Sequence, residues 1–337
     1  MNKKLISAAV ASALAVPAVV NADEHTTVQV YGRINNALAH TNPGDGDSEW
    51  GLINISSRLG MKAKADLGNG LSAIGRYEFS TFTNTEGKVD GRGAFNDTRL
   101  GYVGLSGAWG AVTVGNQWSA FYDTVGSYLD PTFTVGYAIY SSVVDGPYRA
   151  SNTIKYANSF GPAYLEFDVR MANASATADT EKIGGDSGNG DDVDGIGLGL
   201  NFTVGESFSI AAAVDSEKGA PGEDDTDRWG IAGKFNAAGW WASLGYQEND
   251  NSAAIKTKSI AAYVGGSFGE TSVSLGYASA DIDGLDGDPN QWMLGVYHKM
   301  GGGFRLWYEG TNVDDKDTGS GPDVQRHIFG MRYDFST

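Results

Sequence analysis

The 337-residue sequence contains no cysteine, and after its first 22 residues it has no apolar run of the ~18 residues that a membrane-spanning helix needs. Without cysteine, disulfides, thiol catalysis and cysteine-ligated metals are excluded. Basic residues are also few: 24 Lys and Arg stand against 41 Asp and Glu, for a formal net charge of −17. Because nucleic-acid binding needs a basic surface, the composition argues against a nucleic-acid partner. The four histidines form no zinc motif and no Gly-x-Ser-x-Gly elbow is present, so the sequence indicates no enzyme, catalytic residue or metal site.

The first 22 residues have the features of a secretory signal peptide. Lys3 and Lys4 precede an apolar stretch over 5–20, and Val20-Asn21-Ala22 fits the small-x-small cleavage pattern. We therefore expect a signal peptide over 1–22 that is removed on export, and one domain over 23–337. An N-terminal membrane anchor is the alternative, but the stretch is short and ends at a cleavage site.

Apolar and polar residues alternate with a period of two along most of the chain. Over 163–171 the apolar set is Ala163, Leu165, Phe167, Val169 and Met171, and the polar set is Tyr164, Glu166, Asp168 and Arg170. Over 53–65 the same alternation predicts one strand in which Ile53, Ile55 and Met61 lie on the same apolar face. Alternation of this kind predicts strands with one polar face. A mean hydropathy of −0.27 is compatible with strands that turn only every second residue toward lipid.

Sixteen such segments are found. They lie at about 28–40, 51–65, 70–81, 96–106, 109–118, 149–158, 162–172, 194–203, 207–216, 227–236, 239–248, 255–267, 270–280, 289–299, 303–313 and 324–335. The connections alternate between short Gly-, Asn- or Pro-containing turns and long Asp- and Gly-rich loops. We predict an all-β protein, a 16-stranded antiparallel transmembrane β-barrel with short periplasmic turns and long outer loops. A soluble β-sandwich would also alternate, but it has no reason to sort its connections by length.

Several short motifs resemble one known family. They are Val28-Gln-Val-Tyr-Gly-Arg-Ile-Asn35, Ser57-Arg-Leu-Gly-Met-Lys62, Thr98-Arg-Leu-Gly-Tyr-Val-Gly-Leu105, Arg149-Ala-Ser-Asn-Thr-Ile-Lys-Tyr156 and Met331-Arg-Tyr-Asp-Phe335. Together they resemble strands of the Gram-negative general porins. The resemblance implies a homotrimer in the cell outer membrane, in contact with lipid and lipopolysaccharide. It also implies a water-filled channel for passive diffusion of ions and small hydrophilic solutes, narrowed by a third outer loop that folds inward. The loop in that position is 119–148.

Alternation and the resemblance together suggest a candidate pore constriction. Alternation places Arg33, Arg58, Arg76 and Arg99 on the non-lipid face, and Arg149 begins the strand after the third long loop. In the resembled family a basic wall faces loop carboxylates. This implies a basic wall of Arg58, Arg99 and Arg149, with Arg33 and Arg76, opposite the loop acids Asp123, Asp130 and Asp145. The alternative for each arginine is a structural ion pair with a wall acid such as Glu78, Glu166 or Asp168. Tyr333 and Phe335 are the expected barrel-closing C-terminal aromatics, with two residues after them.

Three questions stay open at the level of sequence. The acidic outer loops could bind divalent cations that bridge to lipopolysaccharide, or form a solvated charged surface; no other cofactor is expected. The acidic total favours cations in the channel, whereas the wall arginines would oppose them locally. A substrate-selective channel and a non-conducting adhesin or structural barrel are the functional alternatives, and the long third loop favours a channel.

Overall fold

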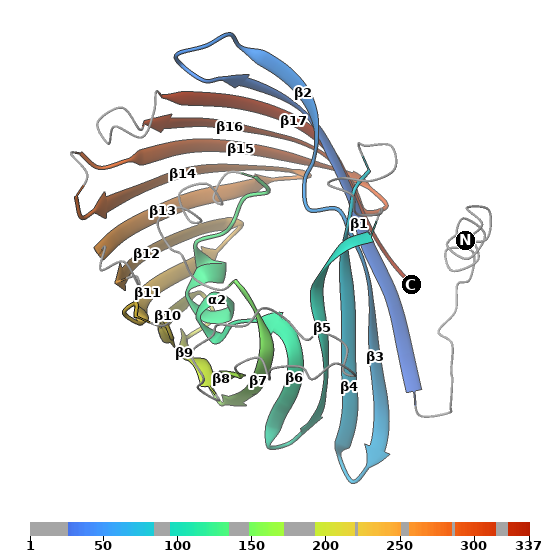
Figure 1. Cartoon of the computed structure of the whole chain (residues 1–337). Coiled ribbons are helices and arrows are strands. Elements are labelled where there is room, and N and C mark those ends of the chain that lie inside the picture. The colour runs from blue at the N-terminus through green and yellow to red at the C-terminus, as the bar shows by residue number, and fades with distance from the viewer. Residues whose placement is uncertain are drawn as a thin grey trace, which may run out of the picture.

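The fold is a closed β-barrel, as predicted. The computed structural model describes residues 26–83, 95–134, 148–171, 193–219, 222–250, 256–284, 287–314 and 323–337, and the predicted signal peptide lies outside these ranges. Every pairing between neighbouring strands is antiparallel, and the sheet closes where the last strand, β17, pairs with the first, β1 (Figure 1). No helix in the described ranges is long and apolar enough to cross a membrane.

The strands follow the predicted segments closely. They are β1 (Thr26–Asn42), β2 (Glu49–Asn54), β3 (Arg58–Gly68), β4 (Leu71–Thr81), β5 (Phe95–Gly107), β6 (Gly110–Trp118), β7 (Arg149–Phe160), β8 (Ala163–Met171), β9 (Val193–Val204), β10 (Phe208–Glu217), β11 (Thr226–Ala237), β12 (Trp240–Asp250), β13 (Lys256–Phe268), β14 (Thr271–Ile282), β15 (Asn290–Gly301), β16 (Phe304–Asp314) and β17 (Val324–Ser336). Both β2 and β3 pair with β1, so these two elements together form one interrupted strand, and the barrel has sixteen strands.

The break between β2 and β3 corrects one prediction. Ser56 has φ = 53°, which interrupts the extended backbone. Across this break the alternation changes phase, so Ile53 pairs with the inward Ala37 and packs beside the buried Ile55, while Met61 is exposed on the outside. The prediction that Ile53 and Ile55 share the lipid-facing side with Met61 is therefore wrong. A period-two pattern does not reveal a single residue with positive φ.

The apolar face of the strands points outward. On β8, Phe167 is 41% exposed whereas its neighbour Asp168 is fully buried, the reverse of a water-soluble sheet. The charged sets that the sequence placed on the non-lipid face therefore point into the barrel. This arrangement suits a barrel in a bilayer, where lipid covers the apolar side chains.

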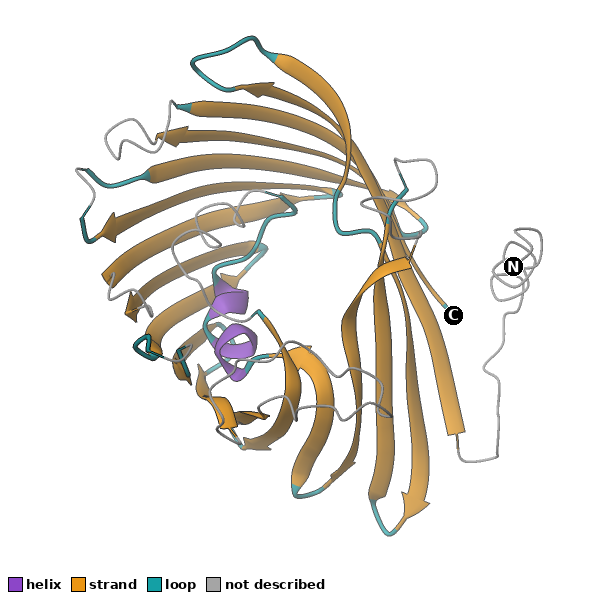
Figure 2. Cartoon of the chain, viewed as in Figure 1, coloured by secondary structure: helices purple, strands orange, loops and turns teal. Residues whose placement is uncertain are grey.

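The third long connection enters the barrel. It carries a short helix, α2 (Ala120–Thr124), and a 3₁₀ turn, η1 (Gly126–Tyr128), and both lie inside the ring of strands (Figure 2). Phe121, Val125 and Leu129 recur every four residues on this segment and form a buried cluster with small inward residues of the wall. That apolar contact holds the segment against one side of the lumen. This confirms the inward loop for its described part, 119–134.

Glycines on the inner wall make room for the segment. A Cβ built on Gly199 would lie 2.6 Å from the carbonyl oxygen of Ala120, and one built on Gly245 would lie 2.6 Å from Leu129. A side chain at either position would push the loop toward the opening of the barrel.

The C-terminal aromatics lie on the closing strand. Tyr333 pairs with Ile34 and Phe335 with Gly32 on β1. A Cβ on Gly32 would be 2.3 Å from the Phe335 ring, so glycine is required there for the ring to lie over β1. The residues after Phe335 extend the seam, because the Thr337 N–H donates to the Val30 carbonyl over 3.0 Å.

Candidate functional site

A cavity of about 770 Å³ lies between the inward loop and the wall built by β1–β3, β5, β7 and β17. Its lining is rich in arginine. The arginines are Arg33, Arg58, Arg99, Arg149, Arg326 and Arg332, and the acids that line it are Asp130 and Glu49. Alternation explains why so many basic side chains meet there, since every second residue of each strand points into the barrel. The cavity therefore carries a local excess of positive charge.

Glu78 on β4 organises one half of the arginine wall. Its buried carboxylate lies 2.8 Å from Arg99 Nε, 3.0 Å from Arg76 Nη2 and 3.7 Å from Arg58 Nη1. The Tyr31 hydroxyl donates to the same carboxylate over 2.8 Å. One carboxylate therefore fixes three guanidinium groups, and it neutralises only part of their charge.

Asp334 on β17 holds the other half. Its carboxylate accepts hydrogen bonds from Arg33 over 2.8 Å and from Arg332 over 2.7 Å, with Arg305 at 3.9 Å. The Arg332 guanidinium also lies 4.4 Å from the ring centroid of Phe133 on the inward loop. Wall and loop therefore meet directly at this point, through a cation–π contact.

The inward loop presents the partly buried Asp130 and the Tyr122 ring to the arginines, and Trp118 at the end of β6 presents a second ring. The Tyr122 hydroxyl donates to Asp130 over 2.9 Å, and Arg149 stacks at 5.2 Å from the ring centroid of Trp118. Burial raises the pKa of Asp130 above that of an ordinary aspartate, although the Tyr122 hydrogen bond and the positive Arg58 oppose the rise. Burial together with the nearby Asp130 also raises the pKa of Tyr122.

Two wall carboxylates hold the ends of the inward segment. Asp168 on β8 accepts a 2.6 Å hydrogen bond from the backbone N–H of Ala120, the first residue of α2. Glu309 on β16 accepts from the backbone N–H of Phe133 over 2.6 Å and of Thr134 over 2.8 Å, and also from the Thr134 hydroxyl. These bonds to charged acceptors fix the loop across the lumen.

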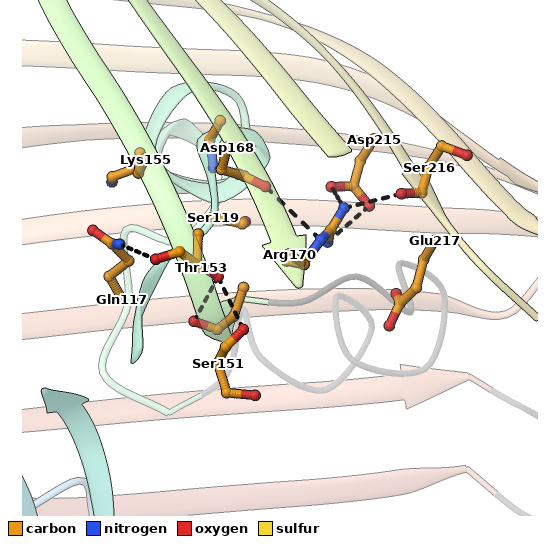
Figure 3. A network of polar contacts seen from close by, with 12 residues as sticks. Gln117, Ser119, Ser151, Thr153, Lys155, Asp168, Arg170, Asp215, Ser216 and Glu217 are labelled. Atoms are coloured by element: carbon orange, nitrogen blue, oxygen red, sulfur yellow. Dashed lines mark hydrogen bonds and ion pairs between the residues drawn. The ribbon is translucent and has the colours of Figure 1, made fainter. Parts of the chain in front are cut away.

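A second charged network joins β8 and β10 through Asp168, Arg170 and Asp215 (Figure 3). Arg170 bridges Asp168 and Asp215, at 3.8 Å and 2.6 Å, and Arg228 reaches Asp215 over 2.7 Å. These groups are buried and paired. The network therefore stabilises the part of the wall that contacts α2, and its residues do not line the arginine cavity.

The predicted site residues divide between three places. Arg33, Arg58, Arg99, Arg149 and Asp130 line one cavity. Arg76 instead hydrogen-bonds Tyr31 over 2.7 Å and pairs with Glu78. Asp123 points toward β7, where it pairs with Lys155 at 2.7 Å, because α2 turns that side chain away from the arginines. Asp145 lies outside the described residues.

Sequence reasoning missed part of the cavity. Arg326 and Arg332, which line it, and Asp334, which holds Arg33 and Arg332, share the inward face of β17. Their alternation with Phe329, Met331 and Tyr333 was a sufficient signal. Glu49, which also lines the cavity, lies between the predicted segments 28–40 and 51–65 but is the first residue of β2. Within the described ranges no group of three or more His, Asp or Glu side chains could hold a metal ion.

Comparison with known proteins decides the family. The model of the Gram-negative porin family matches residues 7–318. The chain belongs to the Gram-negative porins. Outer membrane porin C of Rahnella aquatilis is 28% identical over 259 residues, 74% of this chain and 72% of that protein. An outer membrane porin of Bordetella pertussis is 26% identical over 383 residues, 100% of this chain and 91% of that protein.

The fold comparison agrees. The solved anion-selective porin from Comamonas acidovorans superposes with a TM-score of 0.76 at 23% identity, over 92% of this chain and 100% of that one. The porin described here is therefore an outer-membrane channel for passive diffusion of solutes, in contact with outer-membrane lipid. The family and its fold are those of channels.

Proposed function

We propose that this porin favours small anions over cations, and that the arginine cavity is its selective zone. The observation that carries the proposal is the lining of that cavity, where six arginines face Asp130 and Glu49. Glu78 and Asp334 offset part of the positive charge without cancelling it. In this reading Arg33, Arg58, Arg99 and Arg149 form the basic wall and Asp130 is the opposing loop acid.

The proposal runs against the net charge of the whole chain, which is −17. Surface charges more than about 8 Å apart are largely screened at physiological ionic strength. Selection depends on the charges that line the narrow zone, where wall groups stand in for part of an ion's hydration. The acidic residues of the outer loops then contribute to the surface of the porin more than to its ion preference. A separate proposal is that the acidic outer loops hold divalent cations. The sequence places Asp186 and Asp192 in one of these loops, and both lie outside the described residues.

Passage through the cavity requires no chemical step. A fixed transverse arrangement of arginines and Asp130 orients polar solutes and disfavours apolar ones, which cannot replace the water they displace. The porin therefore acts by size, hydration and charge, and we propose that it catalyses no reaction.

The deciding experiment is single-channel recording of the detergent-extracted, unboiled protein in a planar bilayer with a tenfold KCl gradient. We expect a zero-current potential shifted toward the chloride equilibrium potential. A shift toward the potassium equilibrium potential would overturn the anion preference. Absence of any conductance from correctly inserted protein would favour a plugged structural or adhesive barrel.

The same recording tests the assembly. We propose a homotrimer seated in lipopolysaccharide. A solved porin-fold structure from Vibrio cholerae, 17% identical with a TM-score of 0.67, is described as a trimer form. Closure in three equal steps is expected for a trimer, and single-step closure would contradict it. The solved Comamonas porin is anion-selective, in agreement with the proposed preference, and its likeness to this chain at 23% identity is one of fold.

A further inference from the structure

A second cavity, of about 390 Å³, lies on the other side of the inward loop, toward the short-turn rim. The loop contributes 127–133, and the wall contributes residues from β11, β12 and β14–β16. Several wall residues sit within two positions of a short turn, among them Trp241 and Arg305. A solute that has passed the arginine cavity would therefore meet this second cavity before it leaves the barrel.

Two aromatic side chains with fixed positions line this cavity. The Trp241 indole lies against Gly265, where an added Cβ would be 2.5 Å from Nε1. The Tyr128 hydroxyl donates to Ser209 Oγ over 2.8 Å and accepts from Asn201. Because both rings are held by the wall, they offer apolar surface without losing side-chain freedom when a ligand arrives.

The same cavity is basic. Lys234 and Lys299 line it, and neither makes an ion pair with any residue that the structure describes. The Lys234 ammonium is 5.6 Å from the ring centroid of Tyr128, and Arg305 has only a long contact of 3.9 Å to Asp334. Asp130 is the opposing acid of the lining. Positive charge therefore exceeds negative charge beside the aromatic surface.

The second cavity also contains a buried hydroxyl that makes no hydrogen bond to the described residues. Ser243 is 5% exposed, lines the cavity, and its Oγ has no hydrogen-bond partner among the residues that the structure describes. A buried polar atom without a partner costs free energy, and a ligand oxygen at this position would recover it.

We propose that this second cavity is a transit binding site for small carboxylates that carry a flat ring. The ring packs on Trp241 and Tyr128, while the carboxylate is held by the ammonium groups of Lys234 and Lys299 and by the Ser243 hydroxyl. The site rests on the proposed anion-conducting function. It adds selectivity among anions, which a general charge preference does not provide.

The test is block of KCl current by benzoate, acetate and benzyl alcohol, each added on the short-turn side of single channels at constant ionic strength. Benzoate should reduce the current at a concentration about threefold to tenfold lower than acetate, the gain expected from aromatic packing. Benzyl alcohol, which has the ring without the charge, should block little. Lys234→Gln with Lys299→Gln should raise the half-blocking benzoate concentration by about twofold to tenfold, since exposed ion pairs contribute modestly. Lys258→Gln, at an exposed lysine paired with Asp281 at 3.6 Å, is the matched control and should leave the block unchanged.

Equal block by benzoate and acetate would overturn the ring subsite, and equal block by benzoate and benzyl alcohol would overturn the carboxylate subsite. Stronger block by an uncharged sugar than by benzoate would also overturn the carboxylate subsite. The wild-type comparison decides the proposal even if the lysine variants do not assemble. Failure here is distinct from failure of the proposed function, because the zero-current potential in KCl alone reports the anion preference without benzoate.

Discussion

Glu309 on β16 accepts a hydrogen bond of 2.6 Å from the backbone N–H of Phe133, so a wall carboxylate holds the far end of the inward loop. The same carboxylate accepts from the Thr134 N–H and from the Tyr297 hydroxyl, over 2.8 Å and 2.6 Å. Phe133 in turn packs against Arg332 of the arginine wall. Glu309 therefore helps to set the position of this part of the loop and the shape of the selective zone beside it.

Glu309→Gln should loosen the loop without unfolding the barrel. Glutamine keeps one acceptor oxygen and introduces an amide donor that faces backbone N–H groups. Hydrogen bonds to a charged acceptor contribute roughly 1.5–3 kcal/mol each, so Phe133 and Thr134 are held much more weakly, while the apolar contacts of α2 remain. We expect larger open-channel current noise and a higher mean conductance in single-channel records.

The control for this variant is Glu248→Gln on β12, whose carboxylate accepts a single hydrogen bond within the described part of the chain, of 3.4 Å from Tyr246. It should behave as wild type. Identical noise in Glu309→Gln and Glu248→Gln would show that Glu309 does not hold the loop.

The strands could be predicted from sequence because alternation and turn residues are local signals. The Ala163–Met171 strand repeats its pattern without interruption and was found to within a residue. The prediction of a single strand with one apolar face was wrong at Ser56, where one positive φ changes which residues of the following strand point inward. The contact between the loop and the wall was also missed, although Gly195, Gly197 and Gly199 alternate with Ile196 and Leu198 and so leave inward positions without a side chain. Of the three glycines, Gly199 is the one that faces α2.

Gly199→Ala should disturb the loop from the wall side. The new Cβ would lie 2.5 Å from Thr124 Oγ1 and 2.6 Å from the Ala120 carbonyl oxygen, so α2 must move into the lumen. Overpacking of this kind costs about 1–3 kcal/mol. Conductance should fall and the thermal midpoint of the unboiled form on gels should drop. Gly75→Ala, whose nearest contact would be 3.7 Å away, is the control, and an equal loss in both variants would count against the contact between α2 and the wall.

The site was only partly visible in the sequence because its ion pairs join strands far apart in the chain. Inward orientation of Arg33 follows from alternation, but its partner Asp334 lies 301 positions away and becomes a neighbour only when the barrel closes. Asp123 has the residue type expected of a constriction acid. Its direction is set by the helical turn of α2 and by Lys155, which no local pattern reveals.

Replacing Arg58, Arg99 and Arg149 together with glutamine should shift the zero-current potential in a KCl gradient toward cations. Each substitution removes one positive charge from the cavity. Removing Arg58 and Arg99 also leaves the buried Glu78 with fewer partners, and breaking a buried pair can cost about 3–5 kcal/mol. Arg149→Gln alone leaves the ion pairs of Glu78 with Arg58 and Arg99 in place, and it should give a smaller shift of the same sign. An unchanged potential in a folded Arg149→Gln channel would remove this residue from the selective zone.

Acidification should strengthen the anion preference through Asp130. Burial raises the pKa of this carboxyl, so as the pH falls Asp130 becomes neutral before an ordinary aspartate with a pKa of about 3.9 does. Loss of its negative charge leaves the arginines less opposed, and the zero-current potential in KCl should move further toward the chloride value. In Asp130→Asn the zero-current potential should already lie nearer the chloride value at neutral pH. Its pH dependence should lack the change that the wild type shows above the pH range in which an ordinary aspartate titrates. If the wild type and Asp130→Asn titrate alike, the response belongs to other acids and Asp130 does not face the permeating ions.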